Sequence, residues 1–126
     1  MKRSWFGFFL LVGLLGLSLL SSRAMVRIYQ ADARQLSQAS EEALQGNWRE
    51  AAALTAQVRR SWDKWELFRC AMADHNPAEE IDTLFCVLEV YGSTREELAF
   101  ASVARETAQK LEAMGEAHRL DFCNLL

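Results

Sequence analysis

The feature that most constrains the fold of this sequence is a run of nineteen residues, 4–22, without a charged side chain. As an α-helix with a rise of about 1.5 Å per residue, this run is about 28 Å long, which matches the hydrocarbon core of a bilayer. Its Leu and Phe residues surround the whole helix instead of following one stripe, so a small soluble domain cannot bury them. We therefore expect residues 1–23 to be a membrane anchor, with the lipid bilayer contacting residues 4–22.

A cleaved signal peptide is the alternative interpretation of this segment. Lys2 and Arg3 precede the apolar run, and the small residues Ser22 and Ala24 flank Arg23 in a loose match to a cleavage site. The run is longer than a usual signal-peptide core and is followed directly by basic residues. We therefore favour a retained anchor.

The basic residues are nearly balanced on the two sides of the run, so the positive-inside rule hardly favours either orientation in the membrane. A short basic N-terminus in the cytoplasm is the commoner arrangement for such an anchor. We expect a single-pass protein of the cell membrane with its soluble domain outside the cytoplasm.

The overall charge excludes one class of function. The chain has 14 Lys and Arg against 17 Asp and Glu, a net charge of −3. A broad cationic face, which nucleic-acid binding requires, is therefore not expected, and we predict no nucleic-acid partner. One Pro and six Gly among 126 residues exclude collagen-like and low-complexity chains.

Residues 24–126 show apolar side chains spaced three and four positions apart, as in helices, and no strand-like alternation. Turn signals at residues 46–47, 74–77 and 92–94 divide this part into four helices, the first continuing from the anchor. The sequence thus predicts an all-α protein, in which an antiparallel four-helix bundle of two helical hairpins follows a transmembrane helix.

Two of these turns carry signals for the end of a helix. Gly46 and Gly92 each fit the left-handed residue that ends a helix. Ser93 with Glu96, or Thr94 with Glu97, fits a capping box. A weak internal repeat of 46 residues places Gly46 on Gly92. The stretch GNWREA at residues 46–51 is similar to the inter-helix turn of a tetratricopeptide repeat, but two hairpins are fewer than a solenoid needs.

The helical spacing of Trp48, Trp62 and Trp65 predicts core packing instead of an aromatic ligand surface, because large aromatic side chains dominate burial in small domains. Leu84 is expected in the same core. Cys86 stands among apolar neighbours, so it is predicted to be a small buried hydrophobic residue.

The predicted up-down-up-down order of the helices brings polar side chains together at the membrane-proximal end. The interaction candidates there are Asp74, His75, Asp82 and Asp121, and the weak metal candidates are His75, Asp82 and His118. Their spacing fits no standard zinc pattern, and helix ends collect polar capping groups in any case, so we expect no metal site.

Cys70 and Cys123 are expected at the ends of two parallel helices and are the pair best placed for a disulfide bond in an oxidising compartment. The alternative is three free thiols in a domain that folds without a cross-link. The residues alone leave this choice open.

The order of segments along almost the whole chain resembles that of a known family. The residues that carry the resemblance are Gly46-Asn47-Trp48, His75, Glu80-Ile81-Asp82 and Asn124-Leu125-Leu126. With these residues and its apolar span, the chain resembles the bacterial "domain of unknown function" family 4363 of small membrane-anchored proteins. The resemblance implies a helical architecture and a membrane location. It implies no biochemical activity, because the family has none assigned.

The sequence contains no nucleophile elbow, phosphate-binding loop or Cys-x-x-Cys motif. We therefore expect neither an enzyme nor a cofactor. The favoured function is a membrane-anchored accessory module that binds another membrane or envelope protein. The alternative is a protein that binds a small ligand or a metal through the membrane-proximal cluster of His, Asp and Cys residues.

Overall fold

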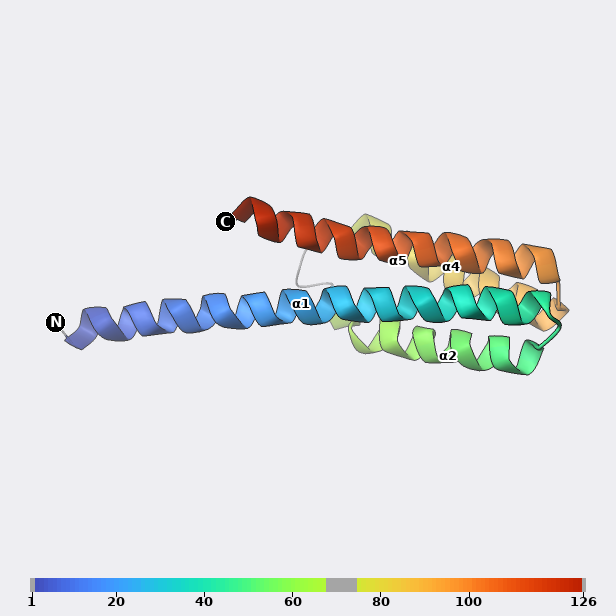
Figure 1. Cartoon of the computed structure of the whole chain (residues 1–126), viewed down its shortest axis with the longest axis horizontal. Coiled ribbons are helices and arrows are strands. Elements are labelled where there is room, and N and C mark those ends of the chain that lie inside the picture. Colours follow the sequence, from blue (N-terminus) through green and yellow to red (C-terminus); the bar gives the residue numbers. More distant parts are fainter. Residues whose placement is uncertain (1, 68–74, 126) are drawn as a thin grey trace.

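The computed structural model describes residues 2–67 and 75–125, and side chains within these ranges except at 75–77, 118 and 120–125. The described residues form four helices and no strand, which confirms the predicted all-α class. The helices are α1 (Lys2–Leu44), α2 (Trp48–Lys64), α4 (His75–Thr94) and α5 (Glu97–Leu125) (Figure 1).

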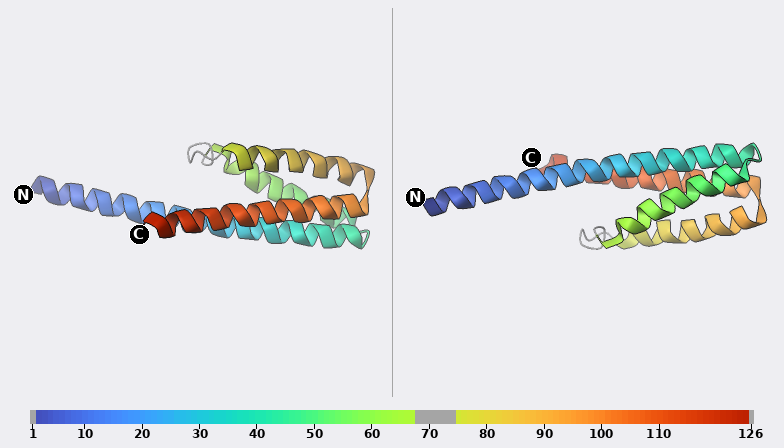
Figure 2. Two further views of the ribbon diagram at one scale, coloured as in Figure 1. Left: turned by 90° about the horizontal axis from the view of Figure 1, so that it is seen from above. Right: turned by 90° about the horizontal axis from the view of Figure 1, so that it is seen from below.

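The helices alternate in direction, and their contacts are uneven. α1 packs most extensively on α5, α2 packs on α1, and α4 packs on α5, whereas α2 and α4 touch only slightly. Figure 2 shows the reason: α2 runs obliquely, starting beside α1 at the turn and ending beside the start of α4. Towards the two hairpin turns, α2 and α4 therefore diverge.

The apolar residues from all four helices meet in one core. Its largest fully buried side chains are Trp62, Tyr29, Phe85, Met25 and Leu36. The core position predicted for Trp62 is confirmed, and Trp48 and Trp65 pack against the core while partly exposed. Burying these large apolar surfaces supplies the main driving force for the fold.

Two apolar residues predicted to lie in the core lie at or near the surface. The Cys86 side chain is exposed, and Leu84 is only half-buried. Both predictions failed for one reason: α4 is apolar around most of its circumference, but the neighbouring helices cover only the face that carries Ile81, Phe85 and Leu88.

The first hairpin turn ends α1 as predicted. Gly46 has a φ of 82°, the left-handed conformation that glycine adopts without a steric penalty. The amide of Asn47 donates to the carbonyl of Glu42 at 2.8 Å, and the amide of Gly46 donates to that of Ala43 at 3.0 Å. This pair of bonds is a Schellman motif, which satisfies carbonyls left free at the end of the helix.

The second hairpin turn differs from the prediction. The left-handed residue is Arg95, with a φ of 55°, and the amide of Glu96 donates to the carbonyl of Tyr91 at 3.1 Å. Gly92 lies inside α4, where a Cβ atom would stand 3.6 Å from the Phe100 ring. Neither predicted capping box forms, because the hydroxyls of Ser93 and Thr94 both donate to carbonyls of α4 itself.

The two left-handed turn residues, Gly46 and Arg95, are thus 49 residues apart, whereas the sequence match placed Gly46 on Gly92 with an offset of 46. The buried positions follow the interval of 49 residues. Residues 51, 55, 58 and 62 of α2 correspond to residues 100, 104, 107 and 111 of α5, and all eight are buried. The two hairpins thus bury equivalent faces although their sequences differ.

α1 is continuous from the uncharged run into the core. Among the described residues, it carries the one segment that is long and apolar enough to span a membrane. Its first buried side chain is that of Met25, and most residues before it are exposed. Most of the apolar run thus projects beyond the other helices, while the end of α5 lies beside its last residues (Figure 1), and the core begins just after it.

Candidate functional site

The main candidate site is a groove of about 630 Å³ between the diverging parts of α2 and α4, which we call the α2/α4 groove. Its lining consists of an apolar floor, two arginines on the α2 side and small or polar residues along both helices. The floor is formed by Phe85, Leu88 and Phe100, the arginines are Arg59 and Arg60, and the remaining residues are Ala52, Thr55, Ala56, Glu89, Gly92 and Ser93.

Small side chains keep this groove open. Ala52 and Ala56 stand one helical turn apart on α2, and Gly92 is a small residue on the α4 side of the lining, so these positions leave space between the helices. The hydroxyls nearby are satisfied within their own helices: Thr55 donates to the carbonyl of Ala51 at 2.7 Å, and Ser93 donates to that of Glu89 at 2.8 Å. These two hydroxyl protons are therefore already used, and the floor residues Phe85, Leu88 and Phe100 are almost fully buried beneath the groove.

Arg59 is the residue of the groove that has a buried polar atom without a hydrogen-bond partner among the described residues. Its guanidinium carbon lies 5.3 Å from the centre of the Phe85 ring, and its Nε atom is 3.4 Å from a carboxylate oxygen of Asp63. Its Nη1 atom is buried and has no hydrogen-bond partner among the described residues. A buried donor without an acceptor costs free energy, so an acceptor that enters the groove would gain this bond.

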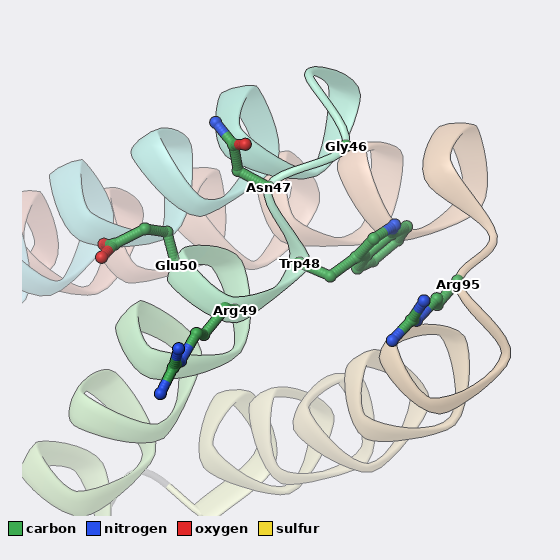
Figure 3. A pocket seen from close by; sticks show the side chains of 6 residues that line it. All are labelled: Gly46, Asn47, Trp48, Arg49, Glu50 and Arg95. Atoms are coloured by element: carbon green, nitrogen blue, oxygen red, sulfur yellow. The ribbon is translucent and has the colours of Figure 1, made fainter.

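A second, shallower pocket of about 360 Å³ lies where the two hairpin turns meet (Figure 3). Its polar side chains do not converge: Asn47 and Glu50 point to one side of the α2 start, and Arg49 to the other. Asn47 donates instead to the Glu42 carboxylate at 2.9 Å. The Trp48 ring packs edge-on against the Phe100 ring, with 5.4 Å between the two ring centres, as part of the core. This pocket is therefore the weaker candidate.

Of the interaction candidates predicted from sequence, only Asp82 has a described side chain. It lies exposed on α4, and its Oδ1 atom accepts a hydrogen bond of 2.6 Å from the indole nitrogen of Trp62. This bond satisfies the polar atom of the largest core side chain.

The other predicted candidates lie outside the described part of the structure. Asp74 and Cys70 are not described, and for His75, His118, Asp121 and Cys123 only the helical backbone is described. The structure therefore does not test the Cys70–Cys123 pairing. Within the described ranges, no group of three or more His, Cys, Asp or Glu residues is arranged to hold a metal ion.

Sequence reasoning also missed the polar contacts that join the helices. The bonds are Ser61 Oγ to Asp32 at 2.9 Å, Arg105 Nε to Ser40 Oγ at 3.3 Å and Lys110 Nζ to Glu80 at 2.7 Å. The bond to Glu80 raises the pKa of Lys110. One signal was available: Asp32 occupies a position on the apolar stripe of Met25, Tyr29 and Leu36, where a carboxylate must find a donor.

None of the protein families, curated proteins or solved structures compared with this chain matches it.

Proposed function

We propose that this protein is a membrane-anchored antiparallel four-helix bundle with a tetratricopeptide-like first turn, and that its function is to bind another membrane or envelope protein. The α2/α4 groove is the proposed binding surface. The observation that carries the proposal is the buried Nη1 atom of Arg59, which has no acceptor within the described residues and stands beside an apolar floor. Binding sites combine such apolar surfaces with a few oriented polar groups.

The height of the groove above the proposed bilayer favours a protein as its occupant. Ser61 bonds to Asp32, which places the two residues at one level. Asp32 is ten residues beyond Ser22, about 15 Å along the helix axis, whereas the headgroup layer adds only about 5–7 Å to the hydrocarbon core. α2 runs towards the proposed membrane, and the groove residues 52–60 precede Ser61 on this helix. The groove therefore lies further from the membrane than Ser61. Lipid chains that stay in the bilayer therefore do not reach the groove.

The groove lining indicates the chemistry of the partner. From Ala52 to Arg60 the α2 wall is about 12 Å long, which is room for about two turns of a docked helix. The floor accepts apolar side chains spaced three or four positions apart, and Arg59 with Arg60 favours an acidic residue among them. We propose an amphipathic helix with one such acidic side chain as the partner segment.

Two alanines on α2 provide a matched test of this proposal. Ala56 lines the groove and Ala53 does not, although both are exposed on the same helix. A photo-crosslinking residue at position 56 should join the protein to one defined partner in native membranes, whereas the same residue at position 53 should not.

Blocking and charge reversal make the test specific. Ala56→Trp fills the groove and should abolish binding of the identified partner segment, while Ala53→Trp should leave it intact. Arg59→Glu should weaken binding, and changing the partner's acidic residue to Lys should restore it. Equal crosslinking from positions 53 and 56, or full binding by Ala56→Trp, would contradict the proposal.

The side of the membrane also remains a proposal. We propose that the helical domain lies outside the cytoplasm, because a short basic N-terminus before an apolar run is usually retained inside.

A further inference from the structure

α5 extends well past its last described core contact, towards the apolar run of α1. At Gly115, a Cβ atom would stand 3.6 Å from that of Tyr29 and 3.9 Å from the carbonyl oxygen of Val26, so this point of α5 is level with about residue 27 of α1. The two helices run in opposite directions with the same rise of about 1.5 Å per residue (Figure 1). Arg119 is therefore level with Arg23, and the last helical residues reach the level of about residue 17.

The burial pattern along α1 supports this register independently. Most residues of the apolar run are exposed, but Gly16, Leu19, Ser21 and Ser22 are partly covered, as is Val26 just beyond the run. All of these except Ser21 are spaced three or four positions apart, so they form one stripe that leads into the buried Met25 and Tyr29. This is the side on which α5 packs at Gly115. α5 thus also covers one side of α1 before Met25, the first core residue, in the part of α1 proposed to lie in the membrane.

The same register groups three exposed arginines. Arg23 and Arg119 share one level, and Arg27 lies one turn, about 6 Å, further from the apolar run. A lipid headgroup layer is about 5–7 Å thick, so Arg23 and Arg119 lie within it and Arg27 lies at its outer edge. Among the described side chains, Arg119 forms a loose ion pair of 3.7 Å with Glu116, and both side chains are exposed. Its exposed guanidinium group can also contact an anion from the solvent side.

We propose that the C-terminal end of α5 is a second membrane contact, in which Arg23, Arg27 and Arg119 bind the phosphates of anionic lipids. Guanidinium groups suit this role, because they bind phosphate oxygens through paired hydrogen bonds. The anionic surface of a bilayer attracts basic residues that lie within the headgroup layer. This contact rests on the proposed anchoring of α1, and it fixes the domain at a second point beside the anchor.

The depth of α5 in the membrane tests the contact. The full-length protein, with its three cysteines changed to serine, is reconstituted in lipid nanodiscs and labelled with an environment-sensitive fluorophore at one new cysteine. The three sites are Ala117→Cys at the proposed headgroup level, Leu15→Cys in the anchor and Asn47→Cys at the distant turn. Lipids with a spin label near the headgroup should quench Ala117→Cys, and lipids labelled deep in the acyl chain should quench Leu15→Cys. Asn47→Cys should stay unquenched.

The outcomes separate this inference from the proposed anchor. If Leu15→Cys is quenched while Ala117→Cys behaves like Asn47→Cys, the anchor stands and the second contact is overturned. If Leu15→Cys is not quenched, both are overturned.

Lipid charge tests the arginines. Adding phosphatidylglycerol to phosphatidylcholine discs should increase the quenching of Ala117→Cys, and raising the salt concentration should reduce the increase. Arg119→Gln should lose most of this increase, and Arg95→Gln, at the distant turn, should retain it. An equal increase in both variants would show that Arg119 does not bind the lipid.

Discussion

The two hairpin turns allow the free-energy cost of the left-handed backbone conformation to be tested, because they place different residues in this conformation. Gly46 and Arg95 both occupy the left-handed position after a helix, with φ values of 82° and 55°. This conformation costs a residue with a side chain about 1–2 kcal/mol, whereas glycine adopts it freely. Both sites are exposed, and no atom lies within 4 Å of a Cβ at position 46. The substitutions therefore act on the backbone and not on packing.

The expected changes have opposite signs. Gly46→Ala gains the left-handed penalty but reduces the entropy of the unfolded chain, which leaves a net loss of about 1 kcal/mol. Arg95→Gly removes the penalty and adds about 0.5–1 kcal/mol of unfolded-state entropy, which leaves a net gain of about 0.5–1 kcal/mol. For a domain of about 100 residues, 1 kcal/mol shifts the Tm by about 4–8 °C.

Thermal unfolding of the detergent-solubilised full chain, followed by far-ultraviolet circular dichroism, measures both shifts. Arg95→Ala is the control, because alanine keeps the backbone penalty while it removes the arginine side chain. We expect a Tm close to that of the wild type for Arg95→Ala and a higher Tm for Arg95→Gly. If both variants shift the Tm equally, the gain comes from loss of the arginine, and the reasoning about backbone conformation is refuted.

Three further predictions concern the core and the membrane. Trp62→Ala should destabilise the domain by about 3–5 kcal/mol, because Trp62 is fully buried and bonds to Asp82. Leu84 is only half-buried, so Leu84→Ala should cost about half as much or less. Equal losses of unfolding free energy in chemical unfolding would contradict the described core. Mass spectrometry of membrane-extracted protein should show the intact residues 1–23, and a mature chain that begins near Met25 in the soluble fraction would show cleavage instead. With Cys86 as the sole cysteine, a membrane-impermeant maleimide should label intact cells, because this thiol is exposed; labelling only after cell lysis would place the domain inside.

Residue patterns predicted much of the fold because they report local physics. Apolar spacing identified the helices and the buried Trp62, and Gly46 identified a turn in which only glycine avoids a steric penalty. Gly92 misled the same reasoning, because it lies inside α4, where a Cβ would make an ordinary contact of 3.6 Å with the Phe100 ring. Arg95 gave no signal, because an arginine rarely takes the left-handed position. Both errors depend on tertiary contacts that a local pattern does not contain.

The candidate site was harder to predict than the fold. Ala52 and Ala56 are visible in the sequence as small residues on α2, but helical spacing does not show whether a neighbouring helix fills the space beside them. The opening arises because α2 runs obliquely away from α4, and this inclination is set by the packing of both helices on their partners. A sequence pattern also does not show that the Nη1 atom of Arg59 lacks a hydrogen-bond partner among the described residues.

Because α1 is one unbroken helix, the proposed anchor and the helical domain should tilt together as one rigid unit. From Arg23 to Leu44 the helix is about 32 Å long, and no turn interrupts it. Transmembrane helices tilt by about 20° on average, and the tilt changes with bilayer thickness. A tilt of that size moves the far end of α1 sideways by about 11 Å and carries the α2/α4 groove with it. With α1 spanning a membrane as proposed, the thickness of that membrane would help to set the direction in which the groove faces the proposed partner.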